Sequence, residues 1–302
     1  MNKFFRNVFV LTVGIAFTFS AASADDAFTK EIEAARAARV QRLTKPDGWL
    51  TLIGLHFLQL GENTIGSAPD NRVIIGKLPE HFGIAMLSAD GTVTFKATDS
   101  GALVDGKPAS GPAILKTSEI DGKAPTLVSS GSVSFFIVER NERKALRIQD
   151  SGSDRRTHFL GLDYFPPDPE WRIEAKWVAF DTPKEVPIAD VIGGISKEKI
   201  PGKAVFEHDG QIVELIPMAE SRDAPLFFVI SDATSGKETY SAARFLYAKQ
   251  SGPDGKVVLD FNLAYNPPCA FTPFATCPLP PPQNRMNFAI TAGEKKYRGE
   301  HE

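Results

Sequence analysis

The sequence predicts a mainly β fold, with one N-terminal helix followed by two β-rich halves, the first of them sandwich-like. Three observations favour this class. The 302 residues include 24 Gly and 22 Pro, which divide the chain into short elements, and 22 Phe, which pack well in sheets. Asp-Gly pairs, which are typical of tight turns, stand between short apolar runs. A single stretch has the periodicity of an amphipathic helix.

The first 24 residues have the three parts of a secretory signal peptide. Lys3 and Arg6 supply the positive start, Val8 to Phe19 is an uncharged apolar run, and residues 22–24 form a small-residue cleavage site. The apolar run is shorter than the roughly 20 residues that a membrane helix needs. We therefore expect cleavage after Ala24 and a periplasmic or secreted protein, rather than an uncleaved anchor.

The charge balance indicates which partners to expect. Cleavage would remove two basic residues and no acidic one, so the 34 basic and 37 acidic residues become 32 and 37, a net charge of −5. No cluster of Lys and Arg remains that could follow a phosphate backbone, so we expect no nucleic-acid partner. No later stretch is apolar enough to cross a membrane, and no pattern predicts a cofactor.

Residues 25–46 are predicted to form the N-terminal helical segment. The helix itself runs from Asp25 to Leu43, and Lys45-Pro46 ends it. Its apolar face is formed by Phe28, Ile32, Ala35 and Val40, and three arginines are expected largely elsewhere: Arg36, Arg39 and Arg42.

Residues 47–150 are predicted to form the sandwich-like half. Short apolar runs alternate there with turn signals at Asp90-Gly91, Asp105-Gly106 and Arg140-Asn141-Glu142, which is typical of a sandwich or barrel. The main expected strands are Thr51 to Leu58, Val73 to Ile75, Ile84 to Leu87, Val93 to Phe95, Val133 to Val138 and Ala145 to Ile148.

Residues 151–169, first polar and then rich in proline, are predicted to connect this half to a second β-rich half at residues 170–302. A turn at Asp209-Gly210 separates the first two strands of the second half. Its expected strands are Val205 to Glu207, Val213 to Ile216, Leu226 to Ile230, Ala243 to Tyr247, Val257 to Leu263 and Phe288 to Ile290.

Polar side chains gather in this second half. Alternate residues of a strand share a face, so Asp260, Asn262 and Asn266 would lie together. A symmetric hairpin would place Arg244 opposite Asp260, as an ion pair worth about 0.2–1 kcal/mol when exposed. The alternative is a solvated sheet face. The full set of candidate catalytic residues is Asp232, Tyr240, Arg244, Asp260, Asn262, Asn266 and Glu294.

Cys269 and Cys277 are the two cysteines of the chain. Export would place them in an oxidising compartment, which favours a disulfide closing a small loop, worth roughly 2.5 kcal/mol. The alternatives are a thiolate metal site or reactive thiol, and two idle thiols. No histidine has ligand spacing to either cysteine, so a metal site is the weaker interpretation.

These residues resemble the domain-of-unknown-function family 1684 over most of the mature chain. The resemblance begins with DGWLTLIGL at 47–55 and GENTIGS at 61–67. It is most specific in Asp260-Phe261-Asn262, in NPPC at 266–269, in CPLPP at 277–281 and in AGEK at 292–295. It implies no settled activity.

The first half also resembles a forkhead-associated sandwich. Leu60-Gly61, Ile65-Gly66, His81 and Asp105-Gly106 occur in the order expected for such domains. Ser67 stands where these domains place a phosphate-holding arginine, so the resemblance implies the sandwich more than phosphopeptide binding.

Two functions are compatible with these features. The first is a noncatalytic protein that binds a small molecule or a cell-envelope component, for which Trp49, Trp171 and Trp177 could contact sugars or peptides. The second is a periplasmic hydrolase built on the polar cluster. There a carboxylate would act as general base, Arg244 would hold an anion, and Asn262 or Asn266 would orient the substrate.

Overall fold

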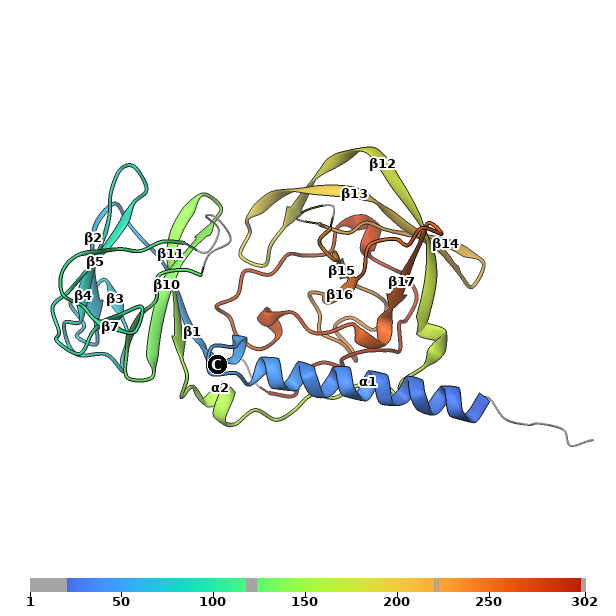
Figure 1. Ribbon diagram of the computed structural model, residues 1–302, viewed down its shortest axis with the longest axis horizontal. Coiled ribbons are helices and arrows are strands. Elements are labelled where there is room, and N and C mark those ends of the chain that lie inside the picture. Colours follow the sequence, from blue (N-terminus) through green and yellow to red (C-terminus); the bar gives the residue numbers. More distant parts are fainter. Residues whose placement is uncertain (1–20, 118–123, 220, 222, 300–302) are drawn as a thin grey trace, which may run out of the picture.

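A computed structural model describes residues 21–117, 124–219, 221 and 223–299 (Figure 1). The predicted signal peptide lies outside these residues except for positions 21–24, whose backbone begins the first helix. The protein is mainly β, with one long helix ahead of several sheets, as the sequence predicts.

The long helix α1 (Ala21–Leu43) runs beside the C-terminal half of the molecule (Figure 1). Ile32 and Leu43 are fully buried, as an amphipathic helix requires. The expectation that the arginines lie away from this face is wrong for two of them. Arg39 follows Ile32 by seven residues, two helical turns, and so returns to the buried face, while Arg36 Nη2 donates to the Phe165 carbonyl at 2.8 Å.

The first half is a sandwich of two sheets around one core. Phe82, Phe95 and Phe135 meet at its centre, with ring centroids 5.7 to 6.3 Å apart. One sheet has the order β1-β11-β10-β9-β6-β7, from β1 (Leu52–Phe57), β6 (Leu103–Val104), β7 (Lys107–Pro108), β9 (Val128–Ser130), β10 (Val133–Arg140) and β11 (Arg143–Asp150). The other has the order β3-β2-β4-β5-β8, from β2 (Gly61–Gly66), β3 (Val73–Ile74), β4 (Gly83–Leu87), β5 (Val93–Ala97) and β8 (Ala113–Ile114).

The predicted turns of this half are present. Arg140 pairs with Arg143 across the β10–β11 hairpin. Asn141 and Glu142 between them have φ values of 51° and 60°, the left-handed conformation that a two-residue hairpin turn needs. Asp105 and Gly106 also have positive φ, at 48° and 75°.

The segment between the halves carries the short helix α2 (Asp154–Thr157) and then a 3-10 turn at Pro169–Trp171. A small apolar cluster joins the parts of the molecule here. Leu43 from the end of α1, Leu50 from the 3-10 turn Trp49–Thr51, and Phe271 from the second half pack together.

The second half contains a four-stranded sheet and a separate strand pair around one core. The sheet order is β14-β13-β12-β17, from β12 (Arg172–Ala189), β13 (Ile195–His208), β14 (Gln211–Leu215) and β17 (Lys256–Asp260). The pair is β15 (Leu226–Ile230) with β16 (Arg244–Ala248). Phe228 and Leu246 from the pair pack with Leu215 and Leu259 from the sheet.

The β12–β13 hairpin, with strands of 18 and 14 residues, reaches across toward the first half (Figure 1). Asn141 Nδ2 in the β10–β11 turn lies 3.4 Å from Asp190 Oδ2 at the hairpin tip. The sequence does not reveal this hairpin, because many side chains of its outer part are exposed and so lack apolar alternation.

Two expectations for the second half are wrong. Strand β17 ends at Asp260 and a 3-10 turn follows at Phe261–Leu263, so the predicted alternation of faces stops there. Asp260, Phe261 and Asn262 are consequently all buried. Residues 288–290 are irregular rather than a strand.

Candidate functional site

The structure separates the predicted polar residues into distinct buried networks. Arg244 pairs with Asp232, whose Oδ2 lies 2.7 Å from Arg244 Nη2. The predicted ion pair between Arg244 and Asp260 is therefore wrong. The expected hairpin does not form, because β16 pairs with β15 and β17 pairs with β12. Arg244 also donates to the carbonyls of Ile290 and Ala292, so this pair braces the irregular C-terminal segment.

Asp260 and Asn262 belong to a second network, beneath α1. Asp260 Oδ2 accepts a 2.7 Å hydrogen bond from Arg172 Nε. The Arg172 guanidinium in turn holds Glu31 of α1 through two hydrogen bonds of 2.9 and 3.0 Å. Asn262 exchanges hydrogen bonds with the backbone of Asp168. These contacts fix the docking of α1 and leave neither side chain available to a substrate.

Glu294 and Asn266 form a third network, which positions Arg39. Glu294 Oε1 accepts from Arg39 Nε at 3.0 Å, and its Oε2 accepts from the Asn266 N–H at 2.8 Å. Arg39 Nη2 donates to the Asn266 carbonyl at 2.8 Å. Burial raises the pKa of Glu294, against the opposing effects of Arg39 and the Asn266 N–H. Arg39 is thus held in one orientation by the Glu294 carboxylate and the Asn266 carbonyl.

Tyr240 lies beside the cysteines. Its hydroxyl donates to the Cys269 carbonyl at 3.0 Å. The Cys269 N–H donates to Cys277 Sγ at 3.2 Å, and both thiols are buried and free, so the predicted disulfide is not formed in this structure. The side-chain hydrogen bond with the Cys269 thiol and burial raise the pKa of the Cys277 thiol, although the Cys269 N–H opposes them, and this disfavours a thiolate there.

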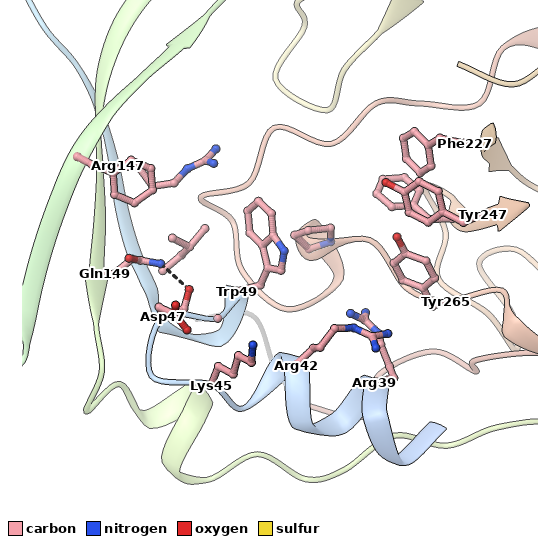
Figure 2. A pocket seen from close by; sticks show the side chains of 15 residues that line it. Arg39, Arg42, Lys45, Asp47, Trp49, Arg147, Gln149, Phe227, Tyr247 and Tyr265 are labelled. Atoms are coloured by element: carbon pink, nitrogen blue, oxygen red, sulfur yellow. Dashed lines mark hydrogen bonds between the residues drawn. The ribbon is translucent and has the colours of Figure 1, made fainter. Parts of the chain in front are cut away.

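A large open cavity lies between the two halves, with a volume of about 850 Å³. We call it the basic cleft (Figure 2). Helix α1 and the turn after it form its floor with Arg39, Arg42 and Lys45; the sandwich contributes Arg147 and Gln149, and the second half contributes Phe227, Tyr247 and Tyr265. Trp49 stands between these two walls.

Positive charge dominates this cleft. Four cationic side chains and one carboxylate, that of Asp47, line it. Arg42 and Lys45 are exposed, and within the described residues neither side chain has an ion pair or a hydrogen bond. Arg42 lies in the last turn of α1 and Lys45 follows the end of the helix, where the helix dipole favours cations. On a chain of net charge −3, this concentration of positive charge would attract an anion.

Aromatic side chains supply an apolar wall. Phe227 and Tyr247 stack with ring centroids 4.8 Å apart, and Tyr247 stacks on Tyr265 at 6.4 Å. The Arg39 guanidinium covers the Tyr265 ring at 4.5 Å, and Arg147 lies 5.3 Å from the Trp49 ring. The cleft therefore combines fixed cations with flat apolar surfaces, which is the usual composition of a small-molecule site.

Of the residues proposed from the sequence, Trp49 lines this cleft, whereas Trp171 is in the core of the second half and Trp177 packs against that core. Sequence reasoning missed the basic floor. The available signal was the spacing from Ile32 to Arg39, which places an arginine on a buried helix face. Within the described residues, no group of three or more His, Cys, Asp or Glu is arranged to hold a metal ion. No helix among them is long and apolar enough to span a membrane.

The fold and the site define a β-rich protein of two halves with a ligand-sized cleft between them. Residues 157–295 match the model of DUF1684, a family of proteins of unknown function, and this later part of the chain belongs to that family. The match covers most of the connecting segment and most of the second half. No curated protein matches the chain.

Several solved structures match the chain. The chain is 32% identical to the uncharacterized protein from gene locus rrnAC0354 of Haloarcula marismortui, known from a solution NMR structure. The similarity covers 48% of this chain and 81% of that one, with a TM-score of 0.40. Rad53 1-466 in complex with AMP-PNP shares 9% identity over 73% of this chain and 49% of that one, with a TM-score of 0.15, which supports no likeness of fold. The forkhead-associated resemblance is not confirmed.

Proposed function

We propose that this protein is an exported binding protein that holds a small organic anion in the basic cleft. The observation that carries the proposal is that two cations and a stacked aromatic wall line the same cleft. The cations are Arg42 and Lys45, which have no partners among the described residues. Arg39 adds a third cation that is already oriented by Glu294, so little side-chain entropy would be lost on binding.

The size and placement of the cleft support this proposal. Its volume of about 850 Å³ lies within the range of about 300–1,000 Å³ typical of small-molecule sites. It also lies between two halves that have separate cores, a common location for such sites.

Calorimetric titration with N-acetylphenylalanine, an anion that carries an aromatic ring, tests the proposal. The neutral N-acetylphenylalaninamide should bind more weakly. Lys45→Gln and Arg42→Gln should each weaken binding of the acid by about tenfold or more, since a hydrogen bond to a charged group contributes roughly 1.5–3 kcal/mol. Lys96→Gln, the same charge change at an exposed site on β5, is the matched control. Equal affinity for acid and amide would refute anion binding.

The hydrolase hypothesis gains no support from the polar cluster. Asp232, Arg244 and Glu294 are each at most 6% exposed and are held in ion pairs within the protein. A general base must reach a substrate proton within hydrogen-bond distance, directly or through one water. The arrangement favours binding over hydrolysis.

We also propose export with cleavage after Ala24, supported by the signal-peptide pattern alone. In an oxidising compartment, the closeness of Cys269 and Cys277 would allow a disulfide. Intact mass of the protein from its native host, after alkylation without reduction, tests both points. We expect a chain beginning at Asp25 that carries no alkyl group. A mass that includes residues 1–24 would contradict cleavage, and two alkyl groups would contradict the disulfide.

A further inference from the structure

A second cavity, of about 780 Å³, opens on the other side of the aromatic wall. We call it the acidic cleft. Its lining includes three carboxylates, those of Glu139, Asp190 and Glu198, and one cation, Arg140. The Arg140 Nε donates a hydrogen bond to the Thr276 hydroxyl oxygen at 2.9 Å. The balance of charge is therefore opposite to that of the basic cleft.

The two clefts adjoin each other. Phe227 and Tyr247 line both of them, so the stacked pair forms a shared boundary rather than a wall closed on one side. Tyr247 is 51% exposed, as expected for a side chain with open space around it. On the acidic side the apolar lining continues with Met218 and Pro278. We call the two adjoining clefts together the groove; its lining is positive at one end, apolar in the middle and negative at the other.

Glu198 is the carboxylate best placed to meet a ligand. Glu139 is paired with Lys144, and Asp190 accepts from the backbone N–H groups of Ile192 and Gly194 in the hairpin turn. The side chain of Glu198, by contrast, has no hydrogen bond or ion pair among the described residues. It shares a face of β13 with Ser196, which also lines the cleft, and it is partly buried. A cation there would meet a carboxylate that is partly shielded from water.

We infer that the ligand is a short peptide with free ends, whose carboxylate lies among Arg39, Arg42 and Lys45 and whose amino group lies at Glu198. This inference rests on the proposed function and names the class of ligand that the same site would take. A free peptide carries one charge of each sign at its two ends with side chains between them. That pattern matches the order of basic, apolar and acidic surfaces along the groove.

The experiment is a calorimetric titration of the purified protein with Ala-Phe-Ala in three forms: free at both ends, N-acetylated, and C-amidated. Either blocking group should weaken binding about tenfold or more. Because an extended chain covers about 3.3–3.6 Å per residue, affinity should also peak at one length in a series from dipeptide to pentapeptide. If the site recognises only the carboxylate, affinity should show no maximum along this series.

Two variants test which side chain contacts each end of the peptide. Glu198→Gln should weaken binding of the free peptide but not of the N-acetylated peptide. Arg42→Gln should weaken binding of the free peptide but not of the C-amidated peptide. Glu185→Gln, an exposed carboxylate on the paired strand β12, is the matched control. If N-acetylation has no effect, or Glu198→Gln weakens both forms equally, the inference is overturned while anion binding stands. If N-acetylphenylalanine also fails to bind, the proposed function falls with it.

Discussion

Two arginines, Arg244 and Arg39, are each held inside the protein by a carboxylate. Arg244 is 1% exposed and pairs with Asp232 in the interior. Burial lowers the pKa of Arg244 while the Asp232 carboxylate raises it, so the charge is tolerated only because a partner and two carbonyls surround it. Arg39 is held by Glu294 in the same manner, but with part of its guanidinium facing the basic cleft.

Removing one member of the Arg244–Asp232 pair should destabilise the second half severely. Asp232→Asn leaves the guanidinium buried without its counter-charge, and such a change costs about 3–5 kcal/mol. Urea unfolding followed by tryptophan fluorescence reports this, since Trp171 and Trp177 lie in that half. The double variant Asp232→Leu with Arg244→Met should lose much less than the sum of the single changes. A cost below 1 kcal/mol for Asp232→Asn would contradict this view of the pair.

At this scale the sequence indicates the right residue types but not their partners. Asp232, Arg244, Asp260 and Glu294 were singled out, and all four are buried and ion-paired. The expected partner of Arg244 was wrong because a strand pairing chosen from loop symmetry ignores the other strands that compete for the same edge. Partners distant in sequence, such as Arg39 for Glu294, leave no local pattern.

Among the elements, those specified by local chemistry are the ones that the sequence predicts. The β10–β11 hairpin is centred on Asn141 and Glu142, as expected from a polar turn between two apolar runs. The end of α1 is fixed by Pro46, which cannot continue a helix. The β12–β13 hairpin is held instead by contacts at its tip, including the 2.8 Å hydrogen bond from the Leu279 N–H to the Ala189 carbonyl. No local rule predicts those contacts.

Asp150, at the end of β11, should make the stability of the sandwich depend on pH. Asp150 is 2% exposed, and although burial raises its pKa, hydrogen bonds from Lys77, Ser132 and the Gly152 N–H outweigh this and hold the pKa below its usual value. The unfolded value is about 3.9. A folded pKa below the unfolded one contributes stability that is present above about pH 4 and is lost as the pH falls through the folded pKa.

Urea unfolding at pH 7 and pH 3, followed by circular dichroism, tests this dependence. Asp150→Asn should be less stable than the wild type at pH 7, and the difference should shrink at pH 3, which is below the unfolded pKa of about 3.9. Asp181→Asn, an exposed carboxylate on β12, should show no such change with pH. A difference between Asp150→Asn and wild type that is the same at both pH values would rule out the proposed contribution.

For the whole molecule, the division into helix, sandwich and second β-rich half is predictable, but the cleft between the halves is not. The two halves have separate cores, each signalled by its own apolar runs. The basic floor comes from α1, the aromatic wall from β15 and β16, and Arg147 from β11. Surfaces contributed by three separate segments are brought together by tertiary packing alone.

The docking of α1 has a consequence for how the chain matures. The helix is made before its anchors, because Arg172, Asn266 and Glu294 follow their partners in α1 by 141, 227 and 255 residues. Ribosomal synthesis or stepwise translocation would therefore deliver Arg39 long before the carboxylate that orients it. The binding surface is completed only after Glu294 has emerged, so a product terminated before that residue could contain a folded sandwich and still lack a competent site.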